Sequence, residues 1–263
     1  MINFENFKKN GYLNIGKVLT DEEINFLKDL ILEKLDYKDN NKKFKFSKNL
    51  LLENKNFFSL LVNPKILSTI RALCDNKKIS FTPHTDIHVN LGAGRIHRDN
   101  RASDRVFGVG SDWDETRQSF NVFRIAIYLT SYEDSKTSLV IFPGTHKNEN
   151  LYQNFWFRFF NKAVHTLRNI FPKIQVHQYS PFIKKKILKV NSGDCIIFDK
   201  RVRHAGGKIS EKSNKISIFF SYGEADNIHT LNDFNFLKSK DYITNYHKDL
   251  QTLFEINNVE YKL

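Results

Sequence analysis

Three residues of this chain have the types and the spacing of a metal centre. His97 and Asp99 are two positions apart, so in an extended strand their side chains point to the same side. His204 lies far downstream, at the end of the strand-like segment 193–204. Two imidazoles and one carboxylate can occupy one face of an Fe(II) ion and leave the opposite face open for O2 and an organic co-substrate. His97, Asp99 and His204 therefore predict the catalytic iron site of an oxygenase.

A second His-x-Asp sequence, His84-Thr85-Asp86, competes with this assignment. An isolated His-x-Asp pattern is more often a surface pair than a metal site. We predict His97 and Asp99 as the ligands because they follow the turn Gly92-Ala93-Gly94, where a ligand can meet an open cavity. His84 and Asp86 lie early in a predicted strand instead.

Such distant ligands need a β-rich framework that brings them together. From Lys78 onwards the chain consists of short β-type segments separated by turns that contain Gly, Pro, Asn and Asp. This pattern is typical of an antiparallel sandwich or a jelly roll. The predicted strands cover residues 79–90, 122–130, 138–142, 186–190, 194–198 and 215–222.

Two helices are predicted before these strands. Thr20 and Glu23 have the spacing of a capping box, which predicts a helix over 21–35. Pro64 suits the first position of a second helix, which should end near Cys74.

The remaining segments complete the expected organisation. We expect a short strand over 4–15, a surface loop over 36–48, and an amphipathic helix between 151 and 171. The tail 227–263 should be helical and pack outside the barrel. The prediction is a single domain, 1–263, with an N-terminal helical part (1–77), a jelly-roll core (78–225) that carries a basic aromatic insert (150–185), and a C-terminal helical tail (226–263).

Composition narrows the class of protein. Hydrophobic residues make up 40% of the chain, which is typical of a globular protein, and no apolar run approaches the about 20 residues of a membrane span. Residues 1–10 do not resemble a secretory signal, so we expect a cytoplasmic protein. Cys74 and Cys195 lie far apart in apolar surroundings, which indicates reduced, buried thiols.

The net charge of +12 favours anionic partners. The excess is uneven, because residues 150–193 contain no Asp or Glu but many Lys, Arg and aromatic residues. Peripheral contact with the inner membrane face through 150–190 is one interpretation. A lid helix buried against the barrel, or against a second subunit, is the other. We expect no nucleic-acid partner and make no prediction of the oligomeric state.

Four motifs in order resemble the phytanoyl-CoA dioxygenase family of Fe(II)/2-oxoglutarate oxygenases, and the likeness runs from Phe7 to about Gly223. They are Phe7–Tyr12 with Glu22-Glu23-Ile24, His97-Arg98-Asp99, Ser138–Lys147 with its Pro-Gly-Thr-His turn, and Ser192–His204. The resemblance implies a mainly β fold with flanking helices and a double-stranded β-helix core of the jelly-roll or cupin type. It also implies Fe(II) and 2-oxoglutarate as cofactors.

The co-substrate site departs from the family pattern in two places. Lys215 stands where relatives place the Arg that binds the far carboxylate of 2-oxoglutarate, and Gly206 stands where they often have a Ser. A lysine offers a point charge in place of a bidentate fork. Arg124 is the alternative anchor, and His88 and Asn90 are further candidates for contact with 2-oxoglutarate or iron-bound water.

The resemblance also bears on the reaction and its substrate. Related halogenases replace the carboxylate ligand by Gly or Ala, so the presence of Asp99 favours hydroxylation. Arg101, Arg105 and Trp113 follow the first iron motif, where relatives place a substrate lid, and are candidates for substrate recognition. The expected reaction is hydroxylation of an unactivated C–H bond in an anionic small molecule, a sugar or glycan precursor, or a glycolipid.

Two alternatives remain at this point. An iron oxygenase that does not use 2-oxoglutarate would fit the changes at Lys215 and Gly206. A non-catalytic jelly-roll module could instead bind an acidic membrane or a nucleic acid through the basic segment 150–193.

Overall fold

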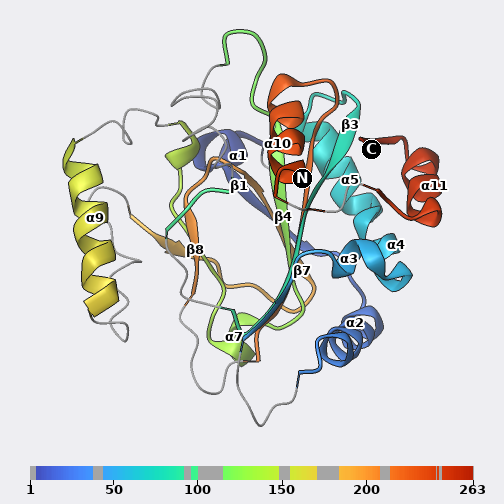
Figure 1. Cartoon of the computed structure of the whole chain (residues 1–263), viewed down its shortest axis with the longest axis horizontal. Helices are drawn as coiled ribbons and strands as arrows, with labels where there is room; N and C mark the ends of the chain where they lie inside the picture. Colours follow the sequence, from blue (N-terminus) through green and yellow to red (C-terminus); the bar gives the residue numbers. More distant parts are fainter. Residues whose placement is uncertain are drawn as a thin grey trace.

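Two β-sheets form the centre of the protein, in a computed structural model that describes residues 4–37, 44–91, 96–99, 115–147, 155–170, 184–207, 214–240, 242 and 245–262 (Figure 1). The larger sheet has the order β1 (Tyr12–Lys17), β7 (Asp194–Asp199), β4 (Val122–Tyr128), β9 (Ile216–Glu224), β3 (Ile79–Val89), β10 (Val259–Tyr261), and β2 (Lys45–Ser47) also pairs with β3. The smaller sheet has the order β6 (Lys186–Ile187), β5 (Leu139–Ile141), β8 (His204–Gly206).

The helices surround these sheets (Figure 1). Those before the sheets in the chain are α1 (Phe4–Asn10), α2 (Asp21–Lys34), α3 (Leu50–Glu53), the 3-10 turn η2 (Lys55–Phe57), α4 (Phe58–Leu61) and α5 (Pro64–Leu73). Those between strands are α7 (Tyr132–Ser135), the 3-10 turn η3 (Thr145–Lys147) and α9 (Phe155–Ile170). The C-terminal part holds α10 (Ile228–Lys238) and α11 (Lys248–Ile256).

Alternation along the central strands gives the larger sheet two buried faces. In β4, Ile125 and Ile127 pack in the core formed with the N-terminal helices and α11. Ala126 and Tyr128 point the other way and pack in a second core with the smaller sheet. Because both faces are buried, the strand reads as an almost continuous apolar run, and Arg124 is a polar exception on the face toward the smaller sheet.

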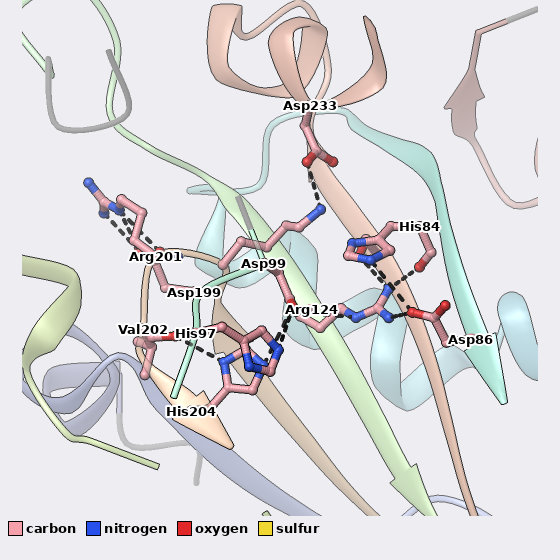
Figure 2. A network of polar contacts seen from close by, with 12 residues as sticks. His84, Asp86, His97, Asp99, Arg124, Asp199, Arg201, Val202, His204 and Asp233 are labelled. Carbon is pink, nitrogen blue, oxygen red and sulfur yellow. Dashed lines mark hydrogen bonds and ion pairs between the residues drawn. The ribbon is translucent and has the colours of Figure 1, made fainter. Parts of the chain in front are cut away.

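An irregularity in β3 brings polar residues close to that face. Pairing with β9 is regular up to Thr82, resumes at Asp86, and shifts its register in between. Pro83 lies in this interval and has no N–H to donate to the sheet, which suits a bulge. The bulge carries His84 and Asp86 into the neighbourhood of Arg124 (Figure 2).

The fold class predicted from the sequence is confirmed. Two packed, largely antiparallel sheets with flanking helices form a jelly-roll type core, although the described strands do not join into one closed sheet. The helices predicted at 21–35 and 64–74 are present: Thr20 and Glu23 form the capping box, and the Asn63 side chain caps the helix that begins at Pro64. Cys74 and Cys195 are free and buried, as predicted.

Several local predictions were wrong. Residues 4–10 form a helix and not the first half of a strand, and the predicted loop over 36–48 contains β2. The tail is not wholly helical, because β10 adds a strand parallel to β3. None of the described helices combines the length and the apolar character that a membrane span requires.

Candidate metal centre

The three predicted ligands converge in the structure. One ligand atom from each of His97, Asp99 and His204 lies within 4.8 Å of the other two. The Oδ1 atom of Asp99 is 3.7 Å from Nε2 of His97 and 3.5 Å from Nε2 of His204. Figure 2 shows the two imidazoles and the carboxylate pointing toward one another. This donor set fits one Fe(II) ion with open coordination positions.

Backbone pairing holds the ligands in this arrangement. His97 and His204 exchange N–H···O bonds of 2.9 and 2.8 Å, and the N–H of Asp99 donates to the Lys200 carbonyl at 3.1 Å. The Nδ1 atom of His204 is 3.0 Å from the Val202 carbonyl oxygen. In the tautomer that carries its proton on Nδ1, this atom donates to the carbonyl, and the lone pair of Nε2 can bind a metal. The distant ligand therefore arrives on a strand, as the sequence predicted.

Arg124 connects the metal centre to the second His-x-Asp sequence. Its buried guanidinium pairs with the Asp86 carboxylate, and its Nε atom is 3.4 Å from Oδ2 of Asp99 (Figure 2). It also donates to Oγ of Ser221 at 3.3 Å and to the His84 carbonyl. The Asp86 carboxylate is thus paired with Arg124, and His84 and Asp86 are not part of the group His97, Asp99 and His204 whose ligand atoms converge.

Electrostatics keep the Asp99 carboxylate charged. Burial alone would raise the pKa of Asp99, but His204 and Arg124 outweigh burial and hold this pKa well below its usual range. Burial raises the pKa of Asp86 to about 6, against the opposing effect of Arg124. Of the two carboxylates beside Arg124, Asp99 is therefore the one whose pKa is lowered, which favours its anionic form.

The metal centre opens into a cavity of about 930 Å³. The described part of its wall contains more cations than anions. The anions are Asp86 and Asp99, and the cations are Lys48, Arg98, Arg124, Lys215 and Lys240. Aromatic rings line the same wall, namely those of Phe46, Tyr128, Phe219, Phe236 and Tyr242. We call this cavity the candidate active-site pocket.

Lys215 lies in the pocket wall and is buried. Its ammonium donates to the Leu91 carbonyl at 3.1 Å, and among the described residues no carboxylate pairs with it. Burial lowers the pKa of Lys215 to about 8. A buried cation without a counter-ion is unfavourable, so this position is prepared for an anionic ligand.

His88 and Asn90, the other two residues predicted to contact 2-oxoglutarate, have different surroundings. His88 lines the pocket, and its ring packs on those of Phe219 and Phe46; burial lowers its pKa well below the usual value. Asn90 is not among the pocket-lining residues. Its side chain accepts from the Lys215 backbone N–H at 2.9 Å and donates to the Tyr37 hydroxyl at 2.6 Å. Asn90 therefore supports Lys215, and its amide is already committed to protein partners.

The predicted recognition residues Arg101, Arg105 and Trp113 lie outside the described residues.

The C-terminal segment forms a part of the pocket wall that the sequence did not predict. The tail was expected to pack outside the barrel, but Phe236, Leu237, Lys240 and Tyr242 line the pocket. The segment is fixed by a buried ion pair of 2.6 Å between Lys200 and Asp233 of α10. No residue spacing in the sequence indicated this contact.

Comparison with known families decides the classification. The phytanoyl-CoA dioxygenase (PhyH) family matches residues 7–216. The chain belongs to the phytanoyl-CoA dioxygenase family. This confirms the resemblance found in the sequence motifs and makes the protein an Fe(II)/2-oxoglutarate-dependent oxygenase.

Solved structures share the fold of this PhyH family member. HygX from Streptomyces hygroscopicus, in a crystal structure with nickel and 2-oxoglutarate bound, has a TM-score of 0.58 and 17% identity over 86% of this chain and 88% of its own. The carbocyclase SnoK and the epimerase SnoN, both described as non-heme alpha-ketoglutarate-dependent enzymes from nogalamycin biosynthesis, each have a TM-score of 0.56, with 16% and 12% identity. They cover 84% of this chain and 83% and 81% of theirs. No curated protein sequence matches the chain.

Proposed function

We propose that His97, Asp99 and His204 hold the iron and that the protein hydroxylates an unactivated C–H bond of an anionic molecule. The observation that carries the proposal is the convergence of the three ligand atoms within 4.8 Å of one another, in the wall of a large pocket. When bound, Fe(II) and 2-oxoglutarate supply the activation of O2, with 2-oxoglutarate converted to succinate and CO2. The protein's own residues bind, orient and exclude water.

Lys215 is the residue that we assign to the far carboxylate of 2-oxoglutarate. It lies in the same pocket as the three ligands, and its buried ammonium has no described carboxylate partner. Arg124 is a poorer anchor, because its guanidinium already pairs with Asp86 and lies 3.4 Å from Asp99. The ammonium of Lys215 would regain a counter-ion only when the co-substrate binds.

Arg124 has a different role in this proposal. It contacts Oδ2 of Asp99, while Oδ1 of the same carboxylate faces both histidines. A residue that holds the second oxygen of a ligating carboxylate fixes the orientation of the first. Arg124 is therefore a positioning residue for the metal ligand.

The charge of the pocket supports an anionic substrate. The bound metal and 2-oxoglutarate carry opposite charges of equal size, so they leave the excess of cations in the wall in place. Lys48 and Lys240 are exposed, have no described carboxylate partner, and lie against aromatic rings. An anionic group at the pocket mouth, as in an acidic sugar, a glycan precursor or a glycolipid headgroup, would meet both lysines.

The test is a coupled assay. Purified protein with Fe(II), 2-oxoglutarate and a panel of acidic sugars and lipids should form succinate in proportion to O2 consumed, and one class of substrate should increase both rates. His97→Ala and His204→Ala should abolish turnover and leave the fold intact. Oxygen uptake without succinate would indicate an iron oxygenase that uses another reductant. Full activity of both variants would refute the metal assignment.

A further inference from the structure

Helix α9 carries an apolar face that is exposed to solvent. Phe155, Trp156 and Phe159 are 69%, 66% and 57% exposed, and Leu167 and Ile170 are 43% and 61% exposed. With about 100° of rotation per residue, all five fall within an arc of about 120° on one side of the helix. The three aromatic rings also contact one another, with centroids 5.6 to 6.4 Å apart. Isolated exposed apolar residues are ordinary, but a continuous face indicates a binding surface.

The segment of the chain that contains α9 is strongly basic. Residues 150–193 contain no Asp or Glu and eight cationic residues, namely Arg158, Lys162, Arg168, Lys173, Lys184, Lys185, Lys186 and Lys189. Five of these have described side chains, all exposed, and none of the five pairs with a described carboxylate: Lys162, Lys184, Lys185, Lys186 and Lys189. By the same helical rotation, Lys162 lies at the edge of the apolar arc and not within it. Ile187, between these lysines in the sequence, is 45% exposed.

We infer that α9 docks on an anionic lipid surface, with its apolar face in the headgroup region and the lysines on lipid phosphates. Aromatic residues together with flanking lysines are the composition of interfacial helices. A second copy of this chain is a poor occupant, because it would bring two basic segments of the same charge together. A nucleic acid is also disfavoured, because Leu167 and Ile170 offer no ring for base stacking.

Trp156 can report on docking directly. The chain has two tryptophans, so Trp113→Phe leaves Trp156 as the single indole. With vesicles of phosphatidylcholine and phosphatidylglycerol, its emission should shift to shorter wavelength, and brominated acyl chains should quench it. Pure phosphatidylcholine vesicles should have much less effect, and added salt should weaken binding to the anionic ones. Unchanged emission with anionic vesicles would overturn the inference.

A matched pair of substitutions distinguishes binding through the α9 face from non-specific binding through any exposed apolar residue. Phe159→Ser should weaken vesicle binding at least about fivefold. Phe26→Ser is the control: Phe26 is 53% exposed on α2, which lies on the opposite side of the protein in Figure 1, with Glu22, Glu23 and Asp29 nearby in sequence. This control should bind vesicles as the wild type does. Equal loss in both variants would refute the assignment to α9.

A separate variant tests the contribution of the lysines to vesicle binding. Replacing Lys184, Lys185 and Lys186 with Gln should lower affinity for anionic vesicles about tenfold or more. Light scattering and competition with duplex DNA exclude the other occupants. A dimer that dissociates on Phe159→Ser, or DNA binding that is lost with this substitution while vesicles fail to bind, would contradict the lipid proposal. None of these readouts requires turnover, so failure here is distinguishable from failure of the proposed reaction.

Discussion

Two buried lysines, Lys200 and Lys215, have opposite environments. Lys200 is 0% exposed, and its ammonium lies 2.6 Å from the Asp233 carboxylate, which ties α10 to the end of β7. Lys215 is 3% exposed and has a backbone carbonyl as its described partner. A buried cation that is paired within the protein maintains the fold, whereas one without a described counter-ion is available for a ligand. The same distinction separates Arg124, which holds Asp86 and Asp99, from the lysines at the pocket mouth.

The largest effect is expected on stability at Lys200. Lys200→Met would leave Asp233 buried without its partner and should reduce the free energy of unfolding by about 3–5 kcal/mol. Lys215→Met should leave it unchanged or increase it, because a buried charge without a counter-ion is removed. Urea unfolding of both variants measures the difference. Equal destabilisation would remove the contrast between the two lysines.

The next effect concerns co-substrate binding. Lys215→Met should raise the KM for 2-oxoglutarate about 10- to 100-fold, because a charge-assisted hydrogen bond to its carboxylate is lost. Lys215→Arg should retain most of the affinity. Initial rates at varied 2-oxoglutarate concentration test this, and Lys240→Gln, which removes a cation at the mouth, serves as the control with an unchanged KM for 2-oxoglutarate. If Lys215→Met bound 2-oxoglutarate normally, the anchor would lie elsewhere.

A smaller change is expected in metal affinity when Arg124 is replaced. Arg124→Lys retains the positive charge but not the geometry that reaches both Asp86 and Asp99. The affinity for Fe(II) should fall about tenfold, the lower end of what partners of metal ligands contribute. Equilibrium Fe(II) binding under anaerobic conditions measures it. A KM effect on 2-oxoglutarate with unchanged metal affinity would instead make Arg124 the anchor.

The pH dependence gives the mildest test of the comparison. The pKa of Lys215 is lowered to about 8, so in the free enzyme its ammonium is present below this pH and is lost above it. Since the protonated form binds the carboxylate, kcat/KM for 2-oxoglutarate should fall about tenfold between pH 7 and pH 9. In Lys215→Arg this decrease should be absent, because a guanidinium stays charged. The same decrease in both proteins would assign it to another group.

The sequence predicted the candidate metal ligands better than it predicted the other residues that line the pocket. The two-residue spacing of His97 and Asp99 and the strand-like segment before His204 were sufficient to predict that these three side chains converge, because extended backbone places residues two apart on the same side. Thr20 and Pro64 marked helix starts through local hydrogen bonding and backbone geometry. Each of these patterns lies within a short stretch of sequence, so it can be recognised without knowledge of the fold.

Non-local contacts account for what was missed. The short strands β2, β8 and β10 exist because of their partners in the sheets, and three-residue segments carry too little alternation to be recognised. Phe4 and Phe7 are three residues apart, a helical spacing that the strand prediction overlooked. The Lys200–Asp233 pair joins residues far apart in the chain, so nothing in either segment indicates that α10 lines the pocket.

We propose that His97, Asp99 and His204 bind iron beside a 2-oxoglutarate site completed by Lys215. Anaerobic titration of the protein with Fe(II) and then 2-oxoglutarate, followed by visible absorption, tests this iron and co-substrate site. A weak charge-transfer band should appear in the wild type, require more 2-oxoglutarate in Lys215→Met, and be absent in His204→Ala. A band of full intensity in His204→Ala, or none in the wild-type protein loaded with Fe(II), would refute the assignment of these ligands.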